Sequence, residues 1–307
     1  MLESYLAPEH RCPVVITRVL PLIFVGIWAT GFIAARLVAP YTDPLTFLTY
    51  RYLMSAAVFA LIAVFIGAPW PKGARGWANA LFAGVLLQGI YLGGVFWAVR
   101  HGLPAGIAAL VVGLQPLLTG LLAFPLLGET VGMRKWIGIV LGFGGPLLVL
   151  EPQLHIGLDS VAVAPLLAVI ASMFGITLGT IWQKRTGATA DIRTNAAAQF
   201  IGAAVVTLPV AMLTETGRFD MVWQSWVGLL WSVFGLSVAA ISLLLFMIRR
   251  GSVASVASLF YLVPPVVAIL AYLFFGETLN TLQISGMVIA AAGVAIASRA
   301  PPSPDRS

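Results

Sequence analysis

The chain has 307 residues, of which 60% are hydrophobic and 9% are charged, against about 25% charged residues in an average soluble domain. This composition excludes a soluble globular protein, which needs more polar surface, and it indicates that lipid is the solvent. The net charge of +6 does not indicate nucleic-acid binding, because the basic residues lie in short loops and form no extended patch. The single cysteine, Cys12, excludes disulfides within the chain and cysteine-rich metal sites.

Ten apolar segments have about the length that a helix needs to cross a bilayer, which is roughly 20 residues. In chain order they are 19–35, 45–66, 78–99, 105–127, 136–150, 161–183, 195–214, 226–248, 252–275 and 282–298. The stretch before them, residues 1–18, does not resemble a cleaved signal peptide. The sequence therefore predicts an all-α membrane protein with ten transmembrane helices.

Basic residues are divided unevenly between the two sets of segment ends. Of the 17 Lys and Arg residues, thirteen fall on the side that holds both termini, and the opposite loops hold Arg36, Arg100 and Arg218. The last one, Arg51, lies inside a predicted helix. Because cytoplasmic loops carry an excess of positive charge, we predict an inner (plasma) membrane protein with both termini in the cytoplasm.

A motif occurs twice at a constant separation. Pro116 is followed twelve residues later by Gly-Glu-Thr at 128–130, and Pro264 is followed twelve residues later by Gly-Glu-Thr at 276–278, so the offset is 148 residues. Other pairs have similar offsets: Gly138 and Gly286 at 148, Gly145 and Gly293 at 148, Trp77 and Trp226 at 149, Pro21 and Pro165 at 144, Gly31 and Gly175 at 144. We therefore predict two repeats, 19–150 and 161–298. Since each holds five helices, the second enters the membrane inverted.

These motifs resemble those of the drug/metabolite transporter superfamily, in its EamA-type branch. The resemblance rests on the doubled proline and Gly-Glu-Thr pattern, the glycine-rich last helix of each half, the run Trp-Ala-Thr-Gly-Phe at 28–32 and Arg51 in the second helix. It covers nearly the whole chain. It implies ten helices in inverted repeats and alternating-access transport of small organic solutes, often export.

Arg51 is the sharpest candidate for a binding residue. A charge within the membrane is costly and usually faces a cavity or a partner, so Arg51 can bind a carboxylate or another anionic group of the solute. A structural interpretation stays open, in which the long side chain reaches the outer interface or pairs with a carbonyl. The equivalent position in the second half is Gln199, which keeps a donor and lacks the charge.

The paired prolines indicate irregular backbone inside helices. Pro116 cannot bond the carbonyl of Val112, and Pro264 and Pro265 free the carbonyls of residues 260 and 261. We predict hinges or cavity-lining kinks there, rather than ordinary packing kinks, because the prolines repeat. Further polar and aromatic candidates for lining the solute path are Gln88 and Tyr91, which are expected to share a helix face, with Gln115, Tyr261 and Trp28.

All eleven acidic residues and all three histidines fall outside the predicted helices. Embedded carboxylates serve carriers as proton sites or counter-charges, so this distribution argues against a cation pump and against simple carboxylate proton coupling. It also disfavours a membrane enzyme acting on lipid, and neither a metal site nor a cofactor is expected.

We therefore expect a secondary transporter, and foremost an exporter of amino acids or related carboxylates. Carriers of sugars, nucleosides or organic cations, a lipid-modifying enzyme and a non-transporting receptor are the alternatives. The expected partners are a small-molecule substrate and the lipid bilayer, without nucleic acid; a homodimer stays open.

Overall fold

The computed structural model describes residues 14–115, 163–186, 190–243, 262–278 and 280–298, with positions 117–119, 122, 133, 136–138, 140, 141, 144 and 145. This part of the chain is helical, apart from one isolated β-bridge between Thr42 and Phe219. The all-helical prediction is confirmed for these residues.

The helices follow the predicted apolar segments. The first half contains α1 (Val14–Val38), α2 (Pro44–Ile66), α3 (Gly73–Gly84), the π-helical η1 (Val85–Ile90), α4 (Tyr91–Arg100) and α5 (Ala105–Val112). The second half contains α8 (Val163–Thr186), α9 (Ile192–Thr214), α10 (Trp223–Leu230), the π-helical η2 (Trp231–Ala240), α13 (Val263–Phe275) and α14 (Thr281–Ser298).

Five continuous helical stretches in the described residues are long and apolar enough to cross a membrane: 44–66, 73–100, 163–183, 192–214 and 223–243. Four shorter apolar helices accompany them: 22–38, 105–119, 263–275 and 284–293. The predicted segment 136–150 is described only in part, so the count of ten helices stays a prediction.

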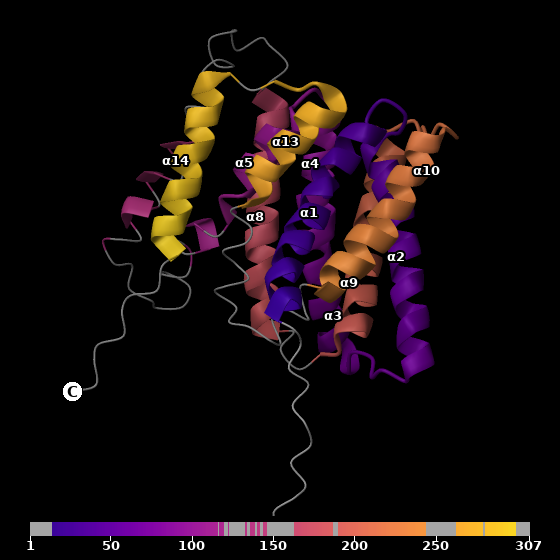
Figure 1. Cartoon of the computed structure of the whole chain (residues 1–307). Helices are drawn as coiled ribbons and strands as arrows, with labels where there is room; N and C mark the ends of the chain where they lie inside the picture. The colour runs from indigo at the N-terminus through magenta and orange to yellow at the C-terminus, as the bar shows by residue number, and fades with distance from the viewer. Residues whose placement is uncertain are drawn as a thin grey trace, which may run out of the picture.

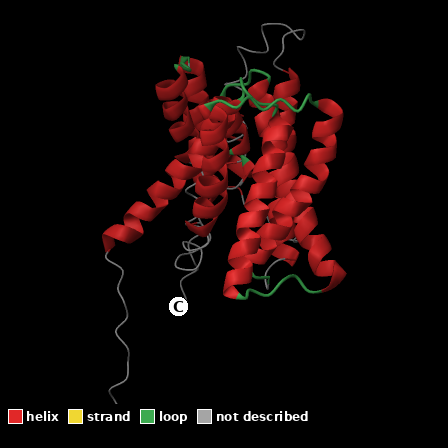
Figure 2. Ribbon diagram, turned by 90° about the vertical axis from the view of Figure 1, so that its right-hand side faces the viewer, coloured by secondary structure: helices red, strands yellow, loops and turns green. Residues whose placement is uncertain are grey.

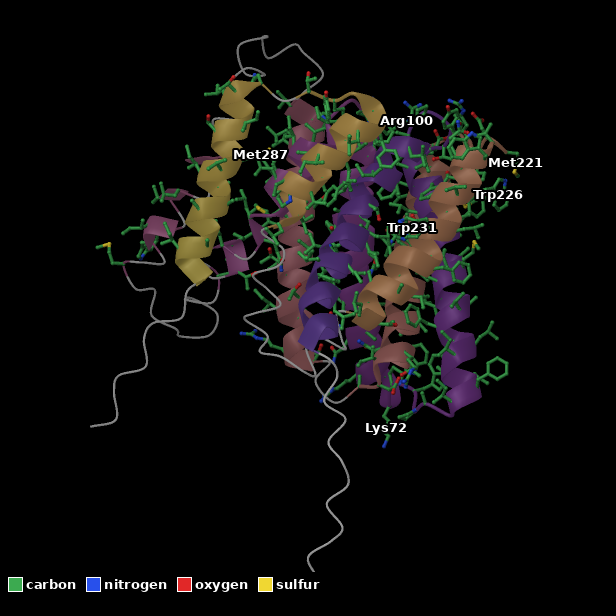
Figure 3. All side chains as sticks on the ribbon, in the orientation of Figure 1. Lys72, Arg100, Met221, Trp226, Trp231 and Met287 are labelled. Atoms are coloured by element: carbon green, nitrogen blue, oxygen red, sulfur yellow. The ribbon has the colours of Figure 1, made fainter. Side chains whose placement is uncertain are left out.

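The helices stand side by side with their loops gathered at two opposite faces (Figures 1 and 2). Lys72 lies at one face, and Arg100 and Met221 lie at the other (Figure 3). Following the predicted charge bias, we call the first the inner face and the second the outer face. The first helices of the two predicted repeats, α1 and α8, run in opposite directions, and α14 ends on the side where α1 begins (Figure 1).

Two of the arginines expected in outer loops lie inside helices instead. Arg36 and Arg100 occupy the last turns of α1 and α4. The helices extend this far because a cation is favourable beside the carbonyls at a helix C-terminus. The apolar runs alone therefore underestimated the length of both helices.

The centre of the bundle is closely packed, whereas large apolar side chains cover the outside. Phe65 and Leu213 are 86% and 87% exposed, as expected for side chains that face lipid. In the interior, α2 packs on α9 through Tyr52 and Phe200, whose ring centroids lie 6.2 Å apart. These two residues are separated by 148 positions, so the predicted repeats meet at equivalent sites.

Candidate functional site

Arg51 is buried inside α2, with 5% of its surface exposed. The helix begins at Pro44, which places Arg51 about 10 Å along it at 1.5 Å per residue. Its Nη2 atom donates a long hydrogen bond of 3.5 Å to Ser237 Oγ, and its Nε atom has no partner in the described residues. A buried charge without a carboxylate partner is costly. The described residues therefore leave the Arg51 guanidinium with too few hydrogen-bond acceptors.

Two π-helical segments bond to α2 at Arg51 and at the residue after it. The hydroxyl of the next residue, Tyr52, donates to the backbone carbonyl of Gln88 in η1 at 2.7 Å. On the other side, Ser237 lies in η2 and donates to the carbonyl of Ser232 at 3.0 Å. Gln88 and Ser237 are 149 residues apart, the offset that relates Trp77 to Trp226. Consecutive residues of α2 thus bond to equivalent positions of two π-helices, a rare structure that is frequent at functional sites.

The prediction that Gln88 and Tyr91 share an α-helical face does not fit the backbone. Gln88 lies in η1, and Tyr91 is the first residue after the end of η1. The backbone hydrogen bonds there follow the wider π-helical register, in which residues three apart do not share a face. Both residues nevertheless lie near this part of α2. Gln88 binds Tyr52 through its backbone, and Tyr91 is 7% exposed and close enough to Arg51 to interact electrostatically.

The other predicted residues have these contacts. Trp28 is half-buried on α1, with its ring 5.4 Å from that of Phe24. Gln115 donates to the Thr180 hydroxyl at 3.5 Å. Gln199 is 7% exposed on α9, and its backbone lies against Gly84, where an added Cβ would overlap it. The structure therefore brings Tyr91 close to Arg51 and Gln88 to the adjacent Tyr52.

Pro264 and Pro265 lie in the first turn of α13, which begins at Val263 in the described residues. A proline costs no helical hydrogen bond there. Pro264 packs on α5, because a Cβ added at Gly113 would lie 2.9 Å from its Cγ atom. Pro116, Tyr261 and the carbonyls of residues 260 and 261 lie outside the described residues, so the predicted kinks stay a prediction.

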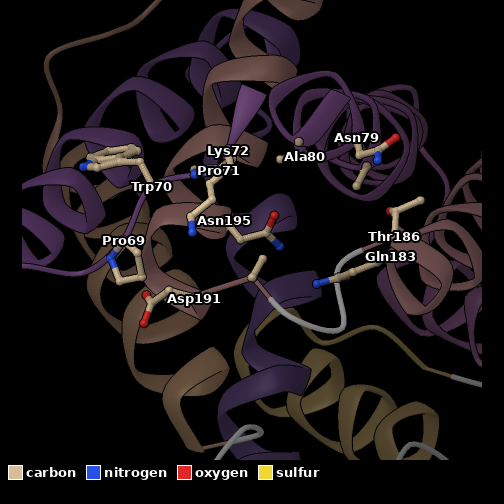
Figure 4. A pocket seen from close by; sticks show the side chains of 13 residues that line it. Pro69, Trp70, Pro71, Lys72, Asn79, Ala80, Gln183, Thr186, Asp191 and Asn195 are labelled. Atoms are coloured by element: carbon tan, nitrogen blue, oxygen red, sulfur yellow. The ribbon is translucent and has the colours of Figure 1, made fainter. Parts of the chain in front are cut away.

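A polar pocket opens at the inner face, and the sequence reasoning missed it. It has a volume of about 400 Å³ and lies between the start of α3, the end of α8 and the start of α9. Three carboxamides line it, one from each helix: Asn79, Gln183 and Asn195 (Figure 4). Trp70, Lys72, Thr186 and Asp191 also contribute to its wall. The sequence did contain a signal for it. At the repeat offsets, the positions equivalent to the three amides hold small or apolar residues: Gly228, Ala39 and Phe47.

At the outer face, two loops bind each other through carboxylates; we call residues 39–46 and 215–220 the outer clamp. Glu215 accepts hydrogen bonds from the backbone N–H groups of Leu45 and Thr46, both at 2.8 Å, and from the Thr46 hydroxyl at 2.9 Å. It therefore caps α2 from the other half of the chain.

Asp43 completes the outer clamp in the reverse direction. It accepts from the N–H of Arg218 at 3.0 Å and from the N–H and hydroxyl of Thr216 at 3.1 and 2.8 Å. Burial by itself raises the pKa of Asp43, but the hydrogen bonds from Arg218 and Thr216 outweigh it and bring the pKa below its ordinary value. The Asp43 carboxylate is therefore held in its charged form at neutral pH.

An ion pair also joins the outer ends of α1 and α13. Arg36 Nε lies 2.9 Å from Glu277 Oε1, and its guanidinium lies 5.7 Å from the centroid of the Phe275 ring. Glu277 belongs to the second Gly-Glu-Thr turn of the repeated motif. It pairs with a residue 241 positions away, so this turn ties the two halves together.

The EamA-like transporter family model matches residues 18–151 and 163–299, so the family pattern occurs twice in the chain. A solved protein crystal structure with 19% sequence identity superposes with a TM-score of 0.64, over 92% of this chain and 97% of that one. At this identity the similarity shows the fold alone.

Curated relatives are similar over most of the chain. A WAT1-related chloroplastic protein of Arabidopsis thaliana is 25% identical over 85% of this chain, which spans 64% of the length of that relative. The uncharacterized inner membrane transporter YedA of Escherichia coli is 28% identical over 84% of this chain and 82% of its own length. A probable amino-acid metabolite efflux pump of Salmonella typhimurium is 26% identical over 90% of this chain and 93% of its own.

Proposed function

The chain belongs to the EamA-like transporter family, and we propose that it exports a small organic solute that carries a carboxylate group. In this proposal it is a secondary transporter of ten helices that works by alternating access between two inverted five-helix repeats. It resides in the inner membrane with both termini in the cytoplasm. Amino acids and related carboxylates are the leading substrate class.

Arg51 carries the proposal. Its guanidinium is buried, makes one hydrogen bond of 3.5 Å and leaves Nε unpartnered in the described residues. A guanidinium presents two parallel donors that match a carboxylate, a geometry that a lysine ammonium lacks. A carboxylate arriving beside Arg51 supplies the acceptor that the described residues do not provide, so solute binding relieves an existing cost.

The surroundings of Arg51 supply the means of exposing it. It lies against η2, and its neighbour Tyr52 is bonded to η1. The π-helical register leaves local backbone groups that can change partner, so a shift of either segment opens the buried arginine. The name of the Salmonella relative, an amino-acid metabolite efflux pump, favours the same substrate class.

Efflux from proteoliposomes tests the proposal. Vesicles with the purified protein are loaded with a mixture of radiolabelled amino acids and their deaminated carboxylate analogues. We expect specific efflux that falls moderately in Arg51→Lys and at least about tenfold in Arg51→Ala, mainly through weaker solute affinity. Arg51→Gln, which reproduces the equivalent Gln199, should lose the preference for carboxylates. Arg75→Gln, an exposed arginine of α3, is the matched control. Normal efflux by folded Arg51→Ala protein would leave the carboxylate preference without support.

A further inference from the structure

Among the described residues, the carboxamides that line the pocket at the inner face have no hydrogen-bond partner. The side chains of Asn79, Gln183 and Asn195 make no hydrogen bond in the part of the chain that the structure describes. Asn195 is 9% exposed, and it extends toward Gln183 across the pocket (Figure 4). Asn195 is buried, whereas Asn79 and Gln183 are half-buried, so the three amides offer unoccupied donors and acceptors to one space.

The pocket is not a necessary result of the fold, because its repeat equivalent is filled. By the repeat offsets, Gly228 is equivalent to Asn79, Ala39 to Gln183 and Phe47 to Asn195. All three are buried, with Ala39 at 6% and Phe47 at 0% exposed. A Cβ added at Gly228 would overlap the side chain of Val38. The duplicated frame therefore packs solidly at the outer face and keeps a polar space at the inner face.

The lining defines the chemistry of the ligand. Each carboxamide offers two donors and one acceptor oxygen, which suits a ligand with both kinds of group. Lys72 brings a positive charge to the wall, whereas the Asp191 carboxylate is already engaged by the N–H and guanidinium of Arg193 at 2.9 and 3.4 Å. The indole of Trp70 forms a flat wall and is held by stacking on Trp77 at 5.8 Å. A volume of about 400 Å³ lies in the usual range for small-molecule sites.

We propose that the inner pocket is a binding site for a small carboxylated solute with amide, ammonium or hydroxyl groups, separate from Arg51. The solute carboxylate lies toward Lys72, and its neutral polar groups bond to Asn79, Gln183 and Asn195. Its role as the entry site for exported solute rests on the proposed function, whereas binding itself does not.

Protection of a cysteine from alkylation tests the proposal. Cys12→Ser removes the native thiol, and Ala190→Cys places a reporter in the pocket wall without removing a carboxamide. In phosphatidylcholine nanodiscs, L-glutamine should slow maleimide labelling of this cysteine at least about fivefold. L-glutaminol, which lacks the carboxylate, should protect less. A reporter at Arg75→Cys, exposed and outside the pocket, should be labelled at one rate throughout.

Variants then assign the protection to the amides. Asn195→Leu and Gln183→Leu in the reporter background should each raise the half-protecting concentration roughly tenfold, and Arg51→Ala should leave it unchanged. Calorimetric titration of Arg51→Ala protein with L-glutamine measures binding at the pocket without a reporter and without a contribution from Arg51. The proposal is overturned if glutamine gives neither protection nor heat, or if only added phosphatidylethanolamine protects, which identifies a lipid headgroup. Protection without carboxylate efflux would contradict the proposed function alone, whereas efflux without protection would contradict this site alone.

Discussion

The outer and inner faces are built from equivalent residues and end in opposite states. At the outer face, Asp43 and Glu215 each accept three hydrogen bonds from the opposing loop. At the inner face, Asp191 is the repeat equivalent of Asp43, and among the described residues its carboxylate accepts only from its near neighbour Arg193. The repeat equivalent of Glu215 is Gly67, which has no side-chain carboxylate.

In the described residues, one side-chain hydrogen bond joins the two halves of the chain at the equivalent place on the inner face. The Thr194 hydroxyl, equivalent to that of Thr46, donates to the carbonyl of Pro69 at 2.8 Å. Beside it lies the polar pocket, where the outer face has Phe47 and Gly228. The difference teaches that duplication sets the helix frame, while a few substitutions decide which face is closed. A conformation sealed outside and hollow inside is the one in which a carrier receives solute from the inner face.

Removing Glu215 should have the largest effect on stability. Glu215→Ala deletes the acceptor for three hydrogen bonds at the start of α2. Bonds to charged groups contribute about 1.5–3 kcal/mol, so we expect a loss of roughly 2–3 kcal/mol, measured by thermal unfolding in detergent. Thr194→Val, which deletes the hydroxyl that bonds to Pro69, should cost about 1 kcal/mol. Equal costs at the two faces would contradict the contrast.

Substitutions at one pair of equivalent positions should also destabilise the protein more at the outer face than at the inner face. Gly228→Ala inserts a methyl group that overlaps Val38, and we expect a loss of about 1–2 kcal/mol. Asn79→Ala removes a side chain that makes no hydrogen bond and lines open space, so its effect should stay within about 0.5 kcal/mol. Unfolding in denaturant measures both. If Asn79→Ala destabilises as much as Gly228→Ala, the pocket is a packed region and not a cavity.

The outer clamp should respond to acid through Asp43. Because its folded pKa is lowered, the carboxylate contributes stability above the unfolded pKa of about 3.9, and this contribution is lost as the pH falls through the folded pKa. Asp43→Asn should therefore lower the unfolding midpoint at pH 7 and lose this difference below about pH 4. Midpoints of both proteins between pH 3 and 8 provide the measurement. A constant difference across that range would show that the charge of Asp43 is unimportant.

The sequence predicts some features of the fold and of the candidate site, and it leaves others hidden. Helices such as α2 and α9 follow from composition, because lipid requires long apolar runs, and Arg51 is conspicuous in one of them. The π-helices are hidden, since packing and not composition selects the register around Gln88 and Ser237. The sequence around Glu215 is that of an ordinary surface loop, yet its carboxylate caps a helix 170 residues away. Asn79 and Asn195 lie near helix ends where polar residues are ordinary, so only the comparison of repeats marks them.

The paired prolines should have the smallest effect on stability. Pro264→Ala lies in the first turn of α13, where proline costs no hydrogen bond, so we expect a change within about 0.5 kcal/mol. If Pro264 and Pro116 shape the path, the alanine variants should nevertheless lower efflux while remaining monodisperse in detergent. Full efflux by both variants would reduce the prolines to packing residues.

Locking the outer clamp tests the central claim, that the outer face must open for transport. Thr42 and Phe219 form an isolated antiparallel bridge across the clamp, so cysteines there lie within reach of a disulfide. The measurement is efflux of labelled amino acids from proteoliposomes that contain Thr42→Cys/Phe219→Cys protein in a Cys12→Ser background, before and after oxidation. We predict that oxidation lowers efflux to the rate of empty vesicles and that a reductant restores it. Unchanged efflux from fully cross-linked protein would contradict the account.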